Sequence, residues 1–245
     1  MKNSQKVQIT GSTGVSIGDV SQTLNDAAAA PHPEPASQPV RILFLASNPE
    51  GTSPLRLDRE VRAISEGLSS SRLRDRFELQ QIWAAGDKEI QDGLLLHQPD
   101  ILHLSGHGSR EGRLLLEREG SMRDLGSHLP AATSTDDLWL RGLVRVVAAT
   151  RGRVRCVVLN ACHSETVARA LAQVTGCVVG MSDSIGDAAA IRFSWSFYNA
   201  LGHGLNVKAA FDAATGQIAM GGWPLDSVPS LVAPGGVDPA GLVFG

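Results

Sequence analysis

Two segments of this sequence each end a short apolar run with a side chain able to do covalent chemistry. Residues 155–162 read Arg-Cys-Val-Val-Leu-Asn-Ala-Cys, and a helical pattern opens just beyond Cys162, near Ser164. Residues 100–108 have the same pattern and end on His107 and Gly108. Open α/β sheets gather their reactive groups at the carboxyl ends of parallel strands. A thiol and an imidazole at such strand ends could serve as a nucleophile and its acid/base partner.

A cysteine nucleophile needs thiolate character, a nearby base and donors for the oxyanion. The position of Cys162 at a helix start would favour the thiolate. His107 can reach the thiol if its strand neighbours the strand before Cys162. The backbone N–H groups of Gly108 and Cys162 are the expected oxyanion hole. The chemistry would be acyl transfer through a thioester, with His107 protonating the leaving amine.

Two other histidines offer alternative assignments. His103 and His107 have the four-residue spacing of a zinc pair, but they fall on a strand and a glycine loop, and no glutamate accompanies them as in a metalloprotease. We therefore expect no metal, and we expect His103 to lie in the core or to support the site. His163 adjoins Cys162, but adjacent side chains at a strand end point apart, so His107 is the preferred base.

Acidic residues near the expected site could set substrate specificity. Asp183 and Asp187 follow the apolar run 178–181, and a carboxylate there would favour a lysine or arginine side chain. Asp187 could instead cap the helix expected over 188–201. Arg110, on the histidine loop, would favour an acidic residue.

The elements around these segments alternate between strand and helix. Apolar runs predict strands at 40–46, 77–83, 101–104, 154–159 and 176–181, and a short hairpin around 113–117. Helical spacing predicts helices at 57–68, from Asp87 to before Pro99, from 136 to about 149, and at 164–173, 188–201 and 207–219, the last capped by Asn206. The fold class predicted is α/β, with a mainly parallel central sheet and helices on both faces.

Composition narrows the functional classes. The 245 residues suffice for one α/β domain with a tail. A net charge of −3 and 4% aromatic residues favour no nucleic-acid partner. No apolar run approaches the roughly 20 residues of a membrane span, and the polar start is unlike a signal peptide. Of three cysteines, Cys156 and Cys177 fall inside apolar runs and should be buried. A reducing, cytoplasmic setting fits best.

The amino-terminal residues differ from the rest. Residues 1–30 hold two short alternating segments, Val7-Gln8-Ile9 and Val15-Ser16-Ile17-Gly18, and residues 31–39 are a proline-rich linker. The two segments resemble the RHIM-type amyloid signalling motifs of immune adaptors, which implies assembly by β-stacking. A disordered tail or a hairpin docked on the domain edge remains the alternative. The main domain is expected over 40–220, followed by an irregular tail over 221–245.

A second resemblance covers residues 40–219, most of the chain. Leu102-His103-Leu104-Ser105-Gly106-His107-Gly108, Leu159-Asn160-Ala161-Cys162, and the segment 187–204 resemble the CHAT domain, a caspase-like cysteine peptidase domain related to separases. The resemblance implies a caspase–haemoglobinase three-layer sandwich and a dyad of His107 and Cys162. It also implies no cofactor, a protein substrate, and in bacteria a role as effector of an immune, antiviral or cell-death system.

Three functions remain open at this point. The first is an endopeptidase activated by an upstream sensor or adaptor, with low activity in isolation because a substrate loop, residues 121–135, must become ordered. The second is a non-catalytic assembly module acting through its amino-terminal segment. The third is a cysteine acyl hydrolase acting on small molecules.

Overall fold

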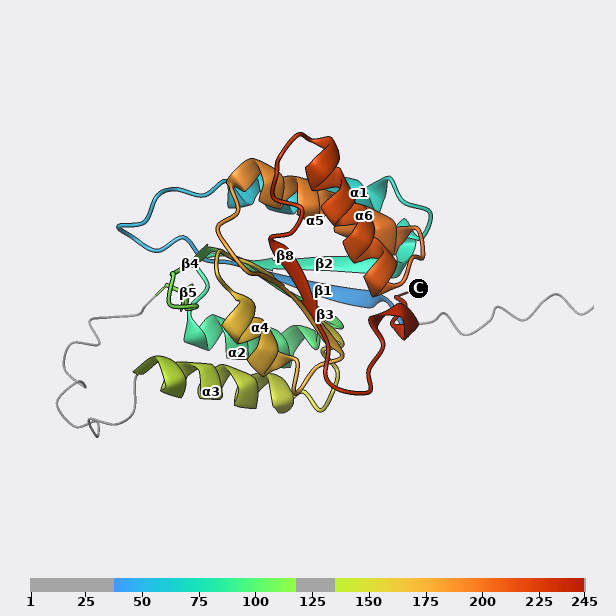
Figure 1. Cartoon of the computed structure of the whole chain (residues 1–245). Helices are drawn as coiled ribbons and strands as arrows, with labels where there is room; N and C mark the ends of the chain where they lie inside the picture. The colour runs from blue at the N-terminus through green and yellow to red at the C-terminus, as the bar shows by residue number, and fades with distance from the viewer. Residues whose placement is uncertain (1–37, 118–134, 245) are drawn as a thin grey trace, which may run out of the picture. The chain divides into compact units, whose positions relative to one another are not determined.

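The computed structural model describes residues 38–117 and 135–244, which belong to one compact unit, Gln38–Gly245. Its main sheet has the strand order β2-β1-β3-β6-β7-β8 (Figure 1). Five strands are mutually parallel, and β8 is antiparallel to β7. These strands are β1 (Val40–Ala46), β2 (Phe77–Ile82), β3 (Ile101–Ser105), β6 (Cys156–Asn160), β7 (Cys177–Met181) and β8 (Pro229–Val232). The predicted α/β class with a mainly parallel sheet is confirmed.

Three helices cover each face of this sheet (Figure 1). Alternate residues of a strand point to opposite faces, so Ile42 and Phe44 of β1 enter one core while Leu43 and Leu45 enter the other. The first core packs against α1 (Leu57–Ser69), α5 (Asp187–Gly202) and α6 (Val207–Met220), and the second against α2 (Asp87–His97), α3 (Thr135–Ala148) and α4 (Glu165–Leu171).

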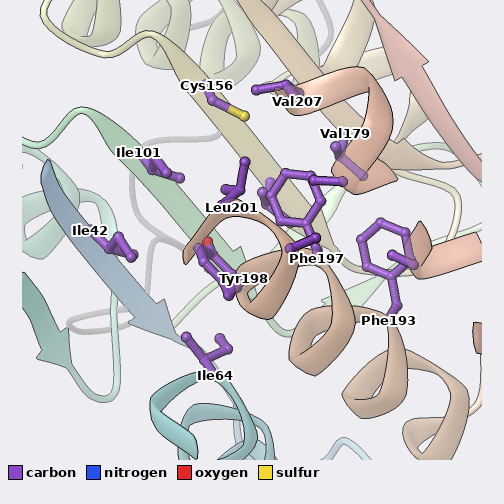
Figure 2. Packing of buried hydrophobic residues seen from close by; sticks show 14 of the residues in the cluster. Ile42, Ile64, Ile101, Cys156, Val179, Phe193, Phe197, Tyr198, Leu201 and Val207 are labelled. Carbon is purple, nitrogen blue, oxygen red and sulfur yellow. The ribbon is translucent and has the colours of Figure 1, made fainter. Parts of the chain in front are cut away.

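Aromatic residues of α5 fill the first core (Figure 2). Phe193, Phe197 and Tyr198 are fully buried, and the Phe193 and Phe197 rings stack with centroids 5.9 Å apart. Full burial of such a side chain stabilises the fold by about 1.5–3 kcal/mol. Helix α5 therefore anchors the layer formed by α1, α5 and α6.

Several local features depart from the sequence-based expectations. Gly86 and Gly186, rather than the aspartates that follow them, occupy the caps before α2 and α5. Helix α4 begins one residue later than expected and spans 7 residues. Part of the carboxy-terminal stretch, expected to be irregular, forms β8 and a short 3-10 turn at Pro239–Gly241, and Phe244 is fully buried. The Asn206 cap is confirmed, since its Oδ1 accepts from the Ala209 N–H at 2.8 Å.

The hairpin predicted around 113–117 is present, but it begins earlier, because His107 and Gly108 form its first strand. Strands β4 (His107–Gly108) and β5 (Leu114–Leu115) pair antiparallel directly after β3. The amino-terminal segment, most of the proline-rich linker and the loop over 121–134 lie outside the described residues. Within the described residues, no helix is both long and apolar enough to cross a membrane.

Candidate active site

Adjacent strands carry the two predicted reactive residues. Strand β3 pairs with β6 in parallel, with Ser105 opposite Asn160, so both strands end at the same edge of the sheet. His107 and Cys162 follow those strand ends by two residues, and both line one small cleft of about 40 Å³. The condition set by the sequence, that the two strands be neighbours, is met.

The His107 ring is oriented by a backbone carbonyl. Its Nε2 lies 2.7 Å from the Ser53 carbonyl oxygen, in the loop between β1 and α1. Because a carbonyl oxygen can only accept, Nε2 must carry a proton. In the neutral imidazole the lone pair then lies on Nδ1, so the tautomer is fixed from outside the histidine loop.

Gly108 lies against the backbone of Cys162. A Cβ atom placed on Gly108 would lie 1.7 Å from the Cys162 carbonyl oxygen and 3.1 Å from its nitrogen. Only a residue without a side chain permits this approach, and that explains the glycine after His107. The approach ties the hairpin carrying His107 directly to the turn carrying Cys162.

The Cys162 thiol faces the loop between β7 and α5. The Ile185 N–H donates to Cys162 Sγ at 3.4 Å, and Sγ lies 3.7 Å from the Ile185 carbonyl oxygen. These two contacts place the thiol against the backbone of Ile185. Helix α4 begins at Glu165, three residues beyond the thiol, so its dipole is more distant from Cys162 than the sequence suggested.

The neighbouring His163 points away from the cleft. It has a left-handed backbone with φ of 53°, its Nε2 lies 3.1 Å from Ser184 Oγ, and its Nδ1 lies 3.7 Å from Asp183 Oδ1. These contacts tie the Cys162 turn to the β7–α5 loop. Residue His163 does not line the cleft that holds Cys162 and His107.

The two aspartates proposed for specificity separate in the structure. Asp187 lines the cleft, and its Oδ2 accepts from the Arg56 backbone N–H at 3.0 Å. Asp183 is outside the cleft lining, with its side chain 72% exposed beside His163. Arg110 is exposed and also lies outside the lining.

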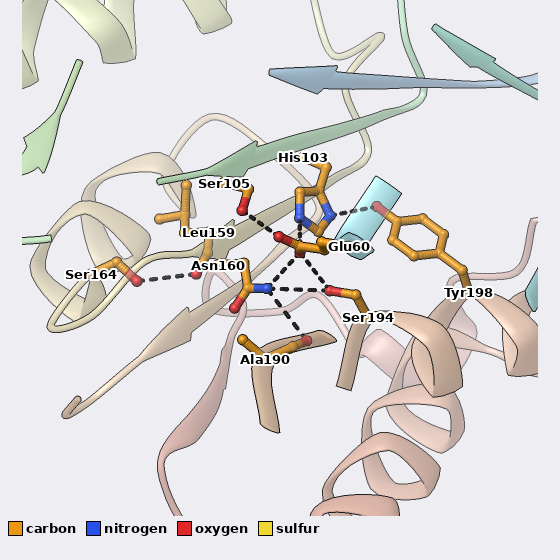
Figure 3. Close-up of polar contacts among 9 residues, drawn as sticks. All are labelled: Glu60, His103, Ser105, Leu159, Asn160, Ser164, Ala190, Ser194 and Tyr198. Atoms are coloured by element: carbon orange, nitrogen blue, oxygen red, sulfur yellow. Dashed lines mark hydrogen bonds and ion pairs between the residues drawn. The ribbon is translucent and has the colours of Figure 1, made fainter. Parts of the chain in front are cut away.

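The Glu60 carboxylate, which belongs to the cleft lining, is buried among hydrogen-bond donors (Figure 3). Glu60 of α1 is 3% exposed, and its Oε1 accepts from His103 Nε2 at 2.9 Å and from Ser194 Oγ at 2.8 Å. Asn160 Nδ2 donates to the same oxygen at 2.5 Å, and Ser105 Oγ donates to Oε2. The cluster joins α1, β3, β6 and α5 at the strand ends that lead to the reactive residues.

Hydrogen bonding keeps this carboxylate charged. Burial alone would raise the pKa of Glu60, but the bonds and charge interaction from His103 and the bonds from Ser105 and Asn160 outweigh it, so its pKa lies below the ordinary value. The Tyr198 hydroxyl lies 3.0 Å from His103 Nδ1, and burial raises the Tyr198 pKa well above its usual range. His103 is therefore a fully buried supporting histidine, as expected.

Sequence reasoning missed two contributors. The Ser53 carbonyl is a backbone group 54 residues from His107, and no residue type marks it. From the sequence alone, Glu60 is one of two acidic residues in the first turn of a helix. Its position on the buried face beside Val61 and Ile64 was the available signal, because a buried acid must be paired.

Comparison with known proteins identifies the architecture. Caspase-1 from Spodoptera frugiperda superposes with a TM-score of 0.51 over 85% of this chain and 90% of that structure, at 13% sequence identity. The fold is therefore the predicted caspase-like three-layer arrangement.

The family follows from the sequence comparison. The CHAT domain matches residues 10–224, and the chain belongs to this family. A Roc-COR-CHAT protease from an unknown prokaryotic organism is 26% identical over 193 residues, covering 77% of this chain and 17% of that protein. A probable protease of Gillisia limnaea is 23% identical over 163 residues, covering 66% of this chain and 27% of that protein. The chain thus spans about a quarter or less of the length of these relatives.

Proposed function

We propose that this protein is a cysteine endopeptidase with Cys162 as nucleophile and His107 as general base. The observation that carries the proposal is the shared cleft of the two side chains, with the Ser53 carbonyl holding the His107 proton on Nε2. That tautomer leaves Nδ1 free to accept a proton. The caspase-like fold and the two relatives named as proteases support the same reaction class.

The reaction proceeds in two stages, formation of a thioester and its hydrolysis. His107 Nδ1 takes the Sγ proton, Sγ bonds to the scissile carbonyl carbon, and the N–H groups of Gly108 and Cys162 donate to the oxyanion. The imidazolium then protonates the departing amine as the C–N bond breaks, which leaves a thioester. In the second stage a water molecule gives a proton to Nδ1 and attacks the thioester. The C–S bond breaks and the proton returns to sulfur, leaving a carboxylic acid product.

A preference for cleavage after a basic residue completes the proposal. The Asp187 carboxylate lines the cleft, whereas the buried Glu60 carboxylate beside it is already held by four donors. The guanidinium of Arg56, a cationic residue of the lining, bonds to Asp58 at 3.2 Å instead of to Asp187. An acceptor-rich lining favours a donor-only side chain such as lysine or arginine. Asp183, proposed from the sequence for the same role, has less support because it lies outside the lining.

The biological role we propose is that of a cytoplasmic effector in a bacterial immune or cell-death system. An upstream sensor or adaptor would switch it on, and stacking through the amino-terminal residues is one route to such a partner. In the relative named a Roc-COR-CHAT protease, the matching region is 17% of a longer protein, which is consistent with a CHAT domain that works together with other domains.

A cleavage profile over a peptide library tests the enzymatic proposal. The wild type should cleave after lysine or arginine, and Cys162→Ala should abolish cleavage without changing the thermal unfolding midpoint. Cys177→Ala is the matched control, because this thiol is fully buried on β7 and should leave cleavage intact. Full biological activity in the Cys162→Ala protein would instead establish the non-catalytic assembly function. Thioester turnover without protein cleavage would establish an acyl hydrolase.

Thiol alkylation tests the dyad separately from substrate choice. Cys156 and Cys177 are fully buried, so iodoacetamide should label the folded protein at Cys162. His107→Ala should slow labelling near neutral pH and move its pH dependence upward, because the base that accepts the Sγ proton is lost. Labelling with the same rate and pH dependence in His107→Ala would contradict the pairing of the two residues.

A further inference from the structure

A second and larger hollow adjoins the cleft of the proposed dyad. Its volume is about 270 Å³, against about 40 Å³ for the cleft itself. Leu55 and Leu57, from the start of α1 and the loop before it, line both spaces. A group bound in the hollow would therefore be a close neighbour of a group bound at Cys162. We call this space the Trp83 hollow, lined by Ala46, Asn48, Leu55, Leu57, Asp58, Trp83, Ala84 and Glu117.

An indole ring forms one wall of the Trp83 hollow. Trp83 directly follows β2 and is 47% exposed, although a ring of this size is usually highly buried. Ala84, which follows it, has a left-handed backbone with φ of 53°. Strain of this kind at a non-glycine residue is kept where the surroundings impose it, often at ligand-binding loops.

Backbone hydrogen bonds hold this wall in place. The Ala85 N–H donates to the Ala46 carbonyl at 2.9 Å, and the Glu117 N–H donates to the Ala85 carbonyl at 3.1 Å. The loop with Trp83 is thus fixed to the end of β1 on one side and to the segment after β5 on the other. A wall fixed before binding reduces the entropy lost when a ligand enters.

The charge of the lining selects the kind of ligand. Its charged side chains are Asp58 and Glu117, both acidic. The Arg56 guanidinium already pairs with Asp58 through two nitrogens, so attraction of a bound cation falls mainly to Glu117. Glu117 Oε1 accepts from the Asn48 backbone N–H at 3.3 Å. Leucine side chains, an indole face and carboxylates together suit a long side chain with an apolar stem and a cationic end.

We propose that the Trp83 hollow binds a second basic side chain of the peptide substrate, a lysine or arginine within two or three residues of the scissile bond. The inference rests on the proposed peptidase function. In an extended peptide, alternate side chains on one face lie about 7 Å apart, a spacing suited to adjoining sites that share Leu55 and Leu57. The stem would lie on the leucines, and the cation over the Trp83 ring beside Glu117.

Peptide cleavage by the full 245-residue chain tests the proposal. Each peptide carries one lysine or arginine at the scissile position, and each position within three residues of it is varied among arginine, leucine and glutamate. The wild type should cleave one doubly basic series with a kcat/KM about 10-fold above its leucine counterpart. Trp83→Ala and Glu117→Gln should each remove most of this preference, while cleavage of the singly basic peptides stays within about 2-fold. Trp83→Phe should restore part of it, because the ring face returns.

Two controls separate the hollow from general effects. Trp195→Ala removes a tryptophan of α5 outside the hollow, and Asp75→Asn removes an exposed carboxylate of the short 3-10 turn after α1. Both should leave the preference unchanged. An equal fall in the cleavage of singly and doubly basic peptides by Trp83→Ala, or a wild-type preference for leucine over arginine at every varied position, would overturn the proposal.

Binding distinguishes failure of the hollow from failure of the peptidase proposal. Calorimetric titration of Cys162→Ala with the doubly basic peptides should give a Kd about 10-fold lower than with the leucine peptides. The added Trp83→Ala change should abolish the difference. If the wild type cleaves none of the peptides and the alkylation of Cys162 does not depend on His107, but this binding difference is present, the hollow stands and the peptidase proposal fails. If Cys162→Ala binds the doubly basic and leucine peptides alike, the hollow proposal fails.

Discussion

Gly108→Ala tests most directly how the hairpin and the thiol turn are held together. The new Cβ would lie 1.7 Å from the Cys162 carbonyl oxygen, and real Cβ contacts essentially never fall under 3.0 Å. The two segments must therefore separate by about 1.3 Å or more. The new Cβ is fixed by the backbone of residue 108 and the atom it meets is a backbone oxygen, so no side-chain rotation relieves the contact. The displacement separates His107 from Cys162, and it also moves both N–H groups of the expected oxyanion hole.

The expected loss of activity follows from that displacement. A misplacement of about 1 Å at a reacting centre can lower the rate by about 100-fold, so Gly108→Ala should lower kcat/KM on a cleavable peptide by at least about that factor. Circular dichroism and thermal unfolding should show a folded protein, since the hairpin lies at the end of the sheet rather than in its core. Gly142→Ala is the control, because a Cβ there meets nothing within 4 Å on α3 and should leave activity unchanged. A folded Gly108→Ala protein with nearly wild-type kcat/KM would refute the close approach of the hairpin to Cys162.

Three further substitutions test the supporting structure. Glu60→Gln should destabilise the fold by about 1–3 kcal/mol, because the new amide nitrogen cannot accept from the donors that face the buried carboxylate. Since the Glu60 pKa is lowered in the folded state, its stabilisation is complete above about pH 4.5 and is lost as the pH falls through the lowered value. Urea unfolding from pH 7 to pH 3 should therefore show that the free energy of unfolding falls less with acid in Glu60→Gln than in the wild type. If the two proteins lose the same free energy over this range, the carboxylate of Glu60 is not ionised in the folded state. Tyr198→Phe should cost about 1–3 kcal/mol in urea unfolding because His103 Nδ1 loses its buried partner, and an unchanged midpoint would contradict that bond. Asn206→Ala should cost about 1 kcal/mol by removing the acceptor for the Ala209 N–H, and a neutral effect would show that α6 does not depend on its cap.

The buried polar cluster fixes the strand ends that lead to the reactive residues. Glu60, His103 and Asn160 come from three elements, and each is at most 5% exposed. Each bond removes a conformational alternative for the strand ends that lead to the reactive residues. A half-satisfied cluster of this kind would be costly, so the network favours one arrangement of α1, β3 and β6.

The sequence predicted the elements well where hydrophobic pattern alone decides them. The aliphatic runs at 40–46 and 156–160 are buried on both faces, and such runs have few alternatives to a central parallel strand. It predicted β8 poorly, because Pro229–Val232 is short, begins with proline and is completed only by its partner β7. Caps were also misplaced by one residue, since glycine and aspartate are both acceptable at a helix start.

The sequence by itself determined the local facts about this protein: which long apolar runs form strands, and that a thiol and an imidazole follow two of them. Residue type and spacing are enough for these, because periodicity and backbone sterics act over a few residues. Only the tertiary structure decided which distant groups meet. The pairing of β3 with β6, the Ser53 carbonyl at His107, the four donors around Glu60 and the separation of Asp187 from Asp183 depend on how helices and strands pack. Such contacts join residues from 43 to 134 positions apart. No local pattern encodes them, because the free energy that selects them comes from burying the whole sheet at once.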